Sequence, residues 1–175
     1  RCKNFNSSHF AYRNLWVGMR RQALEANDAA GLVHHLDQPE VFNKVNAMEL
    51  AQKLAQSGDP VVLDEIALFF SRSGRALVWQ YDSASAPATN VEMYWAWKFA
   101  SCDFSGDCGP GSSILLDACT AGYGCEYASL EDLARATQLS PASFERITAI
   151  KNAIISGVLN GNWPSGFWRP RKREL

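Results

Sequence analysis

The chain has 175 residues, of which 47% are hydrophobic, and its 17 lysines and arginines almost balance its 18 aspartates and glutamates. A chain of this size and apolar content can bury a core as one domain. The net charge of -1 lacks the basic excess typical of nucleic-acid binding. The sequence has no run of about eighteen apolar residues, so we expect no membrane span.

Helical periodicity runs through most of the chain, and no segment shows the alternating pattern of a strand with hairpin turns. Residues 8–27 place their apolar side chains on one helical stripe, and residues 44–56 repeat the pattern. At residues 57–60 (SGDP), glycine suits the end of one helix, while Asp and Pro suit the start of the next. We therefore expect two antiparallel helices joined by a tight turn. The second helix presents an apolar stripe of Val62, Leu63, Ile66, Phe69 and Phe70.

The stretch LAQKLAQSGDPVVLDEIALFF resembles the helix-turn-helix unit of Sel1-type and tetratricopeptide repeats. Shifting the sequence by 31 residues places Asp28 on Asp59, and a second shift of 31 places Asn90 at the same turn. Such periods are typical of stacked helical hairpins. The resemblance covers about residues 20–100 and implies an all-α fold of stacked antiparallel hairpins. An irregular helical bundle with two similar hairpins is the alternative.

Residues 82–89 (DSASAPAT) have the composition of a linker. This linker would divide the single domain, residues 1–175, into a hairpin part (1–82) and a cysteine-containing helical part (89–175). In the second part, serines mark the expected helix starts. These starts lie at Ser112 or Ser113, at Ser129 with Asp132, and at Ser140 with Pro141; the first of these helices is expected to end before Gly122 and the last at Gly161.

Four of the five cysteines form two pairs with a spacing of five, Cys102 with Cys108 and Cys119 with Cys125. Zinc sites favour closer pairs, and thioredoxin-type redox motifs need C-x-x-C. We therefore favour disulfides within each pair, although four cysteines allow three pairings and buried free thiols are an alternative. Disulfides are typical of an oxidising compartment. We expect a periplasmic or secreted protein whose leader peptide has been removed, with Cys2 left over; a cytosolic protein with reduced thiols is the alternative.

The sequence lacks the common nucleophile-elbow, zinc-protease and phosphate-loop motifs. His34 and His35 are adjacent, so on a helix their side chains diverge by about 100°. Asp64 and Glu65 are also adjacent, and a glycosidase-like pair would need a carboxylate from another helix. We therefore expect no catalytic residue, no metal and no cofactor. The alternative is an exported enzyme or toxin, of a hydrolase type, that uses His34 or His35 with helix carboxylates.

Six tryptophans are a high number for this length. Trp95 and Trp97 are two residues apart, so on a helix they face nearly opposite sides and we expect only one to be fully buried. The segment GNWPSGFWRP after the last helix either folds back over the bundle or displays an aromatic-basic peptide, and residues 169–175 are expected to form a solvated tail. Because Trp and Tyr often anchor protein interfaces, the residues we predict to contact a partner are Tyr94, Trp95, Trp97, Trp163 and Trp168.

Together, these features favour an exported protein-binding module, such as a periplasmic immunity or adaptor protein that binds another protein. A structural subunit of an envelope assembly is a further alternative to the enzyme. Whether the chain forms a homo-oligomer is left open.

Overall fold

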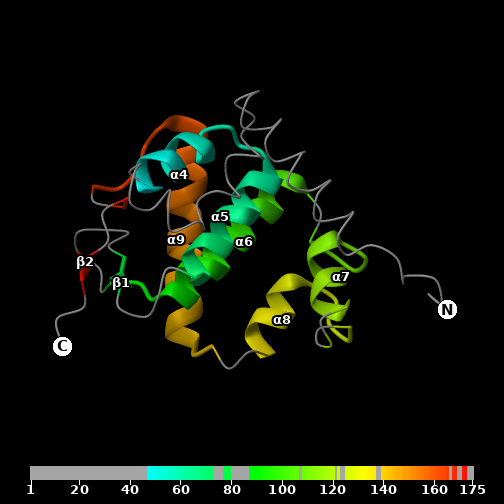
Figure 1. The fold of residues 1–175 in the computed structure, drawn as a ribbon. Coiled ribbons are helices and arrows are strands. Elements are labelled where there is room, and N and C mark those ends of the chain that lie inside the picture. The colour runs from blue at the N-terminus through cyan, green and yellow to red at the C-terminus, as the bar shows by residue number, and fades with distance from the viewer. Residues whose placement is uncertain are drawn as a thin grey trace, which may run out of the picture.

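The computed structural model describes residues 47–72, 77–79, 87–106, 108–120, 122, 125–136, 139–165, 167–168 and 171–172. The elements in these ranges are mainly helices (Figure 1), which agrees with the all-α class. In chain order they are α4 (Ala47–Ala55), α5 (Pro60–Arg72), β1 (Leu77–Val78), α6 (Asn90–Ser105), α7 (Ser113–Thr120), α8 (Leu130–Ala136), α9 (Pro141–Asn160) and β2 (Arg171–Lys172). None of these helices is both long and apolar enough to cross a bilayer.

Several sequence predictions fall outside the described residues. These are the amphipathic helix at residues 8–27, the leftover Cys2, both candidate histidines His34 and His35, and most of the linker, residues 82–86.

The predicted helical hairpin is formed by α4 and α5, which pack against each other across a turn. Gly58 adopts a φ of 64° in this turn, a left-handed conformation that costs glycine little. Asp59 then caps α5, because its Oδ1 accepts a hydrogen bond of 2.8 Å from the backbone N–H of Val61. The stripe predicted for α5 is buried along its whole length and comprises Val62, Leu63, Ile66, Phe69 and Phe70.

Helix α6 lies at the centre of the bundle, in contact with α5, α9 and α8 (Figure 1). It begins with a capping box, in which the Thr89 hydroxyl accepts a hydrogen bond from the backbone N–H of Glu92 and the Glu92 carboxylate accepts one from the backbone N–H of Thr89. Both Trp95 and Trp97 are buried. Trp97 is fully buried and Trp95 is 7% exposed, which agrees with the expectation that only one of them is fully buried. Neighbouring helices cover α6 on more than one side, so Trp95 keeps little exposure.

Two disulfides tie the segment between α6 and α8, and they join Cys102 to Cys108 and Cys119 to Cys125, the pairing that the sequence favoured. The first closes the loop that follows α6, and the second closes the loop that follows α7. Within α7, Leu115 is buried whereas Leu116 is 53% exposed. This short helix therefore packs one face on the protein and leaves the other toward solvent.

The predicted starts of the last two helices are confirmed. At the start of α8, the Ser129 hydroxyl donates a hydrogen bond of 2.8 Å to the Asp132 carboxylate. The same hydroxyl accepts one of 3.1 Å from the backbone N–H of Asp132. At the start of α9, the Ser140 hydroxyl accepts from the backbone N–H of Ser143 at 3.1 Å. The apolar stripe of α9 has a fully buried centre, Ile147, Ile150 and Ile154, and partly buried ends, Phe144 and Val158.

The chain after α9 folds back over the bundle, as one of the two alternatives for this segment predicted, and it buries Phe167 and Trp168. Farther along, β2 (Arg171–Lys172) pairs antiparallel with β1 (Leu77–Val78). Two residues of the segment that we expect to be a solvated tail thus form a short paired strand.

The helix-turn-helix unit expected from the repeat is present at the turn around Asp59, but it is not present at the turn around Asn90. Asn90 begins α6, as the second shift of 31 residues requires, but the described residues before it, 77–79 and 87–89, are not helical. There Trp79 and Ala88 form an antiparallel bridge, with N–H···O distances of 3.1 and 2.7 Å in the two directions. The described part is therefore a helical bundle that contains the α4–α5 hairpin, and the unit around Asp28 lies outside it.

We predict that freshly purified protein, unfolded without reductant, exposes at most one thiol per chain to a thiol-reactive dye, and five after reduction. Four cysteines are held in disulfides, which leaves Cys2. Replacing either bonded pair by serine should lower the free energy of unfolding by about 2 kcal/mol, because each bond closes a short loop. Four or five reactive thiols before reduction would contradict the pairing.

Candidate functional site

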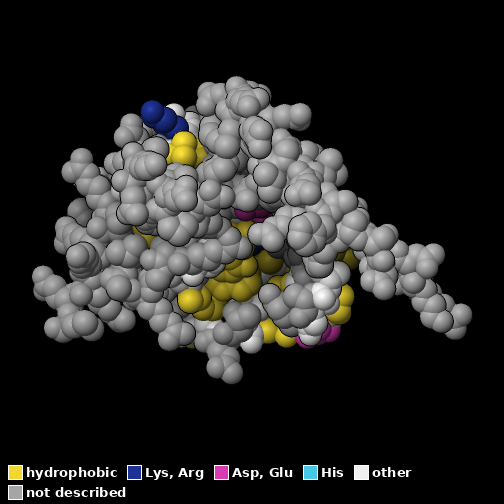
Figure 2. All heavy atoms as spheres, viewed as in Figure 1, with side chains coloured by type: hydrophobic (Ala, Val, Ile, Leu, Met, Phe, Trp, Pro, Cys, Tyr) yellow, Lys and Arg dark blue, Asp and Glu magenta, His cyan; other side chains and the backbone are white. Residues whose placement is uncertain are grey.

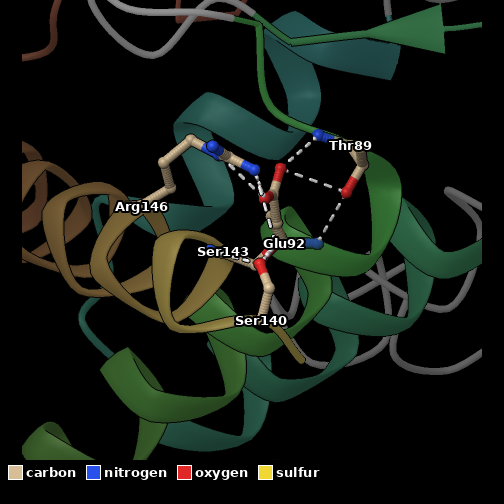
Figure 3. Close-up of polar contacts among 5 residues, drawn as sticks. All are labelled: Thr89, Glu92, Ser140, Ser143 and Arg146. Atoms are coloured by element: carbon tan, nitrogen blue, oxygen red, sulfur yellow. Dashed lines mark hydrogen bonds and ion pairs between the residues drawn. The ribbon is translucent and has the colours of Figure 1, made fainter. Parts of the chain in front are cut away.

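An ion pair between Glu92 and Arg146 joins the N-terminal ends of α6 and α9 (Figure 3). The Glu92 side chain is 3% exposed, and its Oε1 accepts from Nε of Arg146 at 2.8 Å and lies 2.6 Å from Nη2. Its Oε2 accepts from the backbone N–H and the hydroxyl of Thr89, at 2.8 and 3.1 Å. Both oxygens of the buried carboxylate are therefore paired, which offsets the cost of removing its charge from water.

Two serines extend this network to the cap of α9 (Figure 3). The Ser143 hydroxyl accepts a hydrogen bond of 3.4 Å from Nη2 of Arg146. It also accepts one of 3.1 Å from the Ser140 hydroxyl. The same set of side chains thus fixes where α6 and α9 begin and how they meet. We call Thr89, Glu92, Ser140, Ser143 and Arg146 the helix-start network, and its arrangement indicates a structural role.

A second ion pair joins α5 to α6. Nζ of Lys98 lies 2.5 Å from Oδ1 of Asp64, and the two side chains are 9% and 25% exposed. The same ammonium lies 5.7 Å from the ring centroid of Tyr94, within the range of a cation–π contact. One turn farther along α6, the Ser101 hydroxyl donates a hydrogen bond of 2.8 Å to the backbone carbonyl of Pro60. The polar groups that α6 buries are thus paired with α5 on one side and α9 on the other.

Asp64, named for the enzyme alternative, and two carboxylates of another helix, Glu131 and Asp132, have internal partners in the described part of the chain. Asp64 pairs with Lys98, Glu131 pairs with Arg135 at 2.7 Å, and Asp132 caps α8. Among the residues that the structure describes, no group of three His, Cys, Asp or Glu side chains could hold a metal ion. The described carboxylates are therefore placed to stabilise the fold.

One titratable side chain near the second disulfide has a shifted pKa. Partial burial, followed by the charge of Glu126 and a hydrogen bond to it, raises the pKa of Tyr127 above its usual value. The hydroxyl thus stays protonated and donates its hydrogen bond to the Glu126 carboxylate.

A closed group of rings surrounds Trp97. Its indole stacks on Phe70, with centroids 5.8 Å apart and planes 14° apart, and it also contacts Trp163 at 6.2 Å and Trp168 at 5.6 Å. Gly157 of α9 makes room for this packing, because a Cβ built there would lie 2.3 Å from the Trp163 ring. We call these rings, with Phe167, the Trp97 cluster.

A second set of aromatic rings, formed by other residues of α6, extends from α6 to α9. Trp95 contacts Tyr94 at 5.2 Å and Phe99 at 5.9 Å, and Phe99 contacts Phe144 of α9 at 5.9 Å. The guanidinium carbon of Arg135, from α8, lies 3.9 Å from the Phe144 ring centroid, a short cation–π contact. We call Tyr94, Trp95, Phe99, Phe144 and Arg135 the aromatic row.

Unlike the Trp97 cluster, the aromatic row reaches solvent. Trp95 is buried, while Tyr94, Phe99 and Phe144 are partly buried and the Arg135 side chain is 58% exposed. Figure 2 shows hydrophobic side chains gathered at the surface over α5, α6 and α8. The row thus runs from the core to an exposed charge at the junction of α6, α8 and α9.

The five residues predicted to contact a partner divide between these two groups. Trp97 and Trp168 are buried in the Trp97 cluster with the partly buried Trp163, whereas Tyr94 and Trp95 belong to the aromatic row. Their contact with a partner stays a prediction.

The sequence argument missed three members of the row. Phe99 could have been found, because it lies four residues after Trp95 on the same helix. Phe144 and Arg135 come from other helices, so local spacing carries no signal for them.

No protein-family model, curated protein or solved structure matches this chain, so its function is inferred from geometry.

We predict that Glu92→Gln lowers the free energy of unfolding, measured by urea denaturation, by about 3 kcal/mol. Breaking a buried pair leaves one charge uncompensated, and the exposure of Arg146, 34%, moderates the loss. The matched control is Glu131→Gln, which breaks a surface pair with both side chains more than half exposed and should cost less than about 1 kcal/mol. Equal losses for the two variants would contradict the structural role of the network.

Proposed function

We propose that this chain is an exported protein-binding module that docks a partner protein on the aromatic row. The observation that supports this most is the composition and geometry of the row: rings from α6 and α9 that end beneath the exposed guanidinium of Arg135. Aromatic and arginine side chains carry much of the binding energy at protein interfaces. A partner that covers the row would remove its partly exposed rings from water and exclude solvent around the Arg135–Glu131 pair.

The rigidity of the row supports the same proposal. Its rings are supplied by α6 and α9, and the helix-start network joins these two helices through Glu92 and Arg146. A second pair, Lys151 with Asp103 at 2.9 Å, joins the same helices farther along. A surface that is held in place before binding loses less conformational entropy when it binds. In this proposal the Trp97 cluster supports α6 from the other side.

Export is supported by the two disulfides, which are typical of oxidising compartments. The finer form of the proposal is a periplasmic immunity or adaptor protein, for which a small rigid surface that covers a partner is suitable. The enzyme alternative would need His34 or His35, and the structural-subunit alternative would need contacts between copies; the experiment below distinguishes the structural subunit from partner binding.

The test places a photoreactive p-benzoylphenylalanine at Arg135 in the full chain, produced in the cells that make it naturally. We expect irradiation to give one discrete adduct with a different protein. The same residue placed at Asn152, an exposed position of α9, is the control and should give no such adduct. Phe144→Ala combined with the Arg135 probe should weaken the adduct at least tenfold, because the row loses one of the aromatic rings that the partner would cover.

Two results would contradict the proposal. Equal labelling from positions 135 and 152 would mean that the row has no preference over ordinary surface. An adduct formed only with a second copy of this chain would favour the structural-subunit alternative.

A further inference from the structure

The contact between Arg135 and Phe144 in the aromatic row is bordered by carboxylates. Glu131 pairs with Arg135 at 2.7 Å, and both side chains are more than half exposed. Asp132 is exposed and lies three residues before Arg135 on α8. Glu145 is exposed and directly follows Phe144 on α9. Each of these acidic residues is thus within one helical turn of a side chain in the contact, and we call Glu131, Asp132 and Glu145 the acidic rim.

The acidic rim carries more negative charge than the cations of the same helices balance. Arg135 balances one carboxylate of the rim. Lys98 and Arg146, two other cations of α6 and α9, are each paired with a carboxylate outside the rim. In the described part of the chain, no lysine or arginine pairs with Asp132 or Glu145. The row therefore keeps two unbalanced negative charges, whereas the whole chain has a net charge of -1.

A partner that covers the rings of the row also has to meet these carboxylates. Acidic side chains are visible at the edge of the hydrophobic area in Figure 2. A carboxylate that leaves water costs free energy unless a cation replaces its hydration, and an acidic partner surface would be repelled. A second copy of the chain that docked through the same face, in a two-fold contact, would place one acidic rim against the other. The charge of the rim therefore favours a different protein with a basic surface.

We propose that the protein docked on the aromatic row is basic, and that it presents an apolar patch bordered by lysine or arginine side chains. This inference rests on the function proposed above and adds the charge of the partner to it. The apolar patch covers the partly buried rings of Tyr94, Phe99 and Phe144. The bordering cations pair with Asp132 and Glu145. Because complementary charges steer two proteins together before contact, the acidic rim also raises the rate of association.

The test measures the adduct formed by p-benzoylphenylalanine at Arg135, so that binding and its dependence on charge are read from one product. Asp132→Asn/Glu145→Gln removes two negative charges and nearly preserves side-chain size. The matched control, Gln56→Lys/Asn160→Lys, also raises the net charge by two, at exposed positions where α4 and α9 end (Figure 1). Asn160 lies about 22 Å along α9 from Glu145, at 1.5 Å per residue. This distance exceeds the screening length of about 8 Å at physiological salt.

We expect the rim variant to lower the yield of the adduct at least tenfold, and the control variant to change it less than twofold. The partner's peptide at the cross-link should carry more lysine and arginine than aspartate and glutamate. An unchanged yield from the rim variant, or an acidic peptide at the cross-link, would overturn this inference and leave the proposed function standing. If no adduct with a different protein forms, both are overturned.

A second measurement leaves the acidic rim unaltered and covers the case in which the rim variant fails to fold. Cells that carry the probe at Arg135 are lysed, and the lysate is irradiated at low and at high concentrations of sodium chloride. Salt screens exposed ion pairs, so we expect the yield of the adduct to fall at least tenfold at high salt. A yield that is the same at both concentrations contradicts a basic partner.

Discussion

A helix covered by neighbours on several sides has to satisfy the polar groups it carries, because water no longer reaches them. The buried charged and hydroxyl side chains of α6 are Glu92, Lys98 and Ser101, whereas the buried indole N–H of Trp97 has no partner among the described residues. Glu92 pairs with Arg146 of α9, and Lys98 and Ser101 pair with α5, through Asp64 and the carbonyl of Pro60. The arrangement of α5 and α9 around α6 therefore follows from polar pairing as much as from apolar burial.

The same burial gives α6 two aromatic faces with different surroundings. Trp97 is covered by Trp163, Phe167 and Trp168, which follow α9 in the chain. Trp95 and Phe99 belong to the aromatic row, which ends at Arg135. The two disulfides act nearby but locally, since each closes a short loop beside α6 or α7.

Local features were predicted well from the sequence, because their causes lie within a few residues. The cap at Ser140, the turn at Gly58 and the pairing of cysteines with five residues between them all depend on short-range geometry. That Trp95 keeps only 7% exposure beside the fully buried Trp97 was not predicted, because it depends on how many helices surround α6. The stacking of Arg135 on Phe144 joins α8 to α9, and β2 joins the end of the chain to β1. Such contacts between distant segments leave no periodic pattern in one sequence.

The central claim is that α6 holds the bundle together, and native-state amide hydrogen exchange tests it most directly. Amides in a central, fully packed element exchange only when the whole protein unfolds, whereas peripheral elements open locally. The account predicts that residues 94–102 of α6 are the most protected in the chain, with an opening free energy equal to that of global unfolding. Exchange in α6 as fast as in the peripheral helix α8 would contradict it.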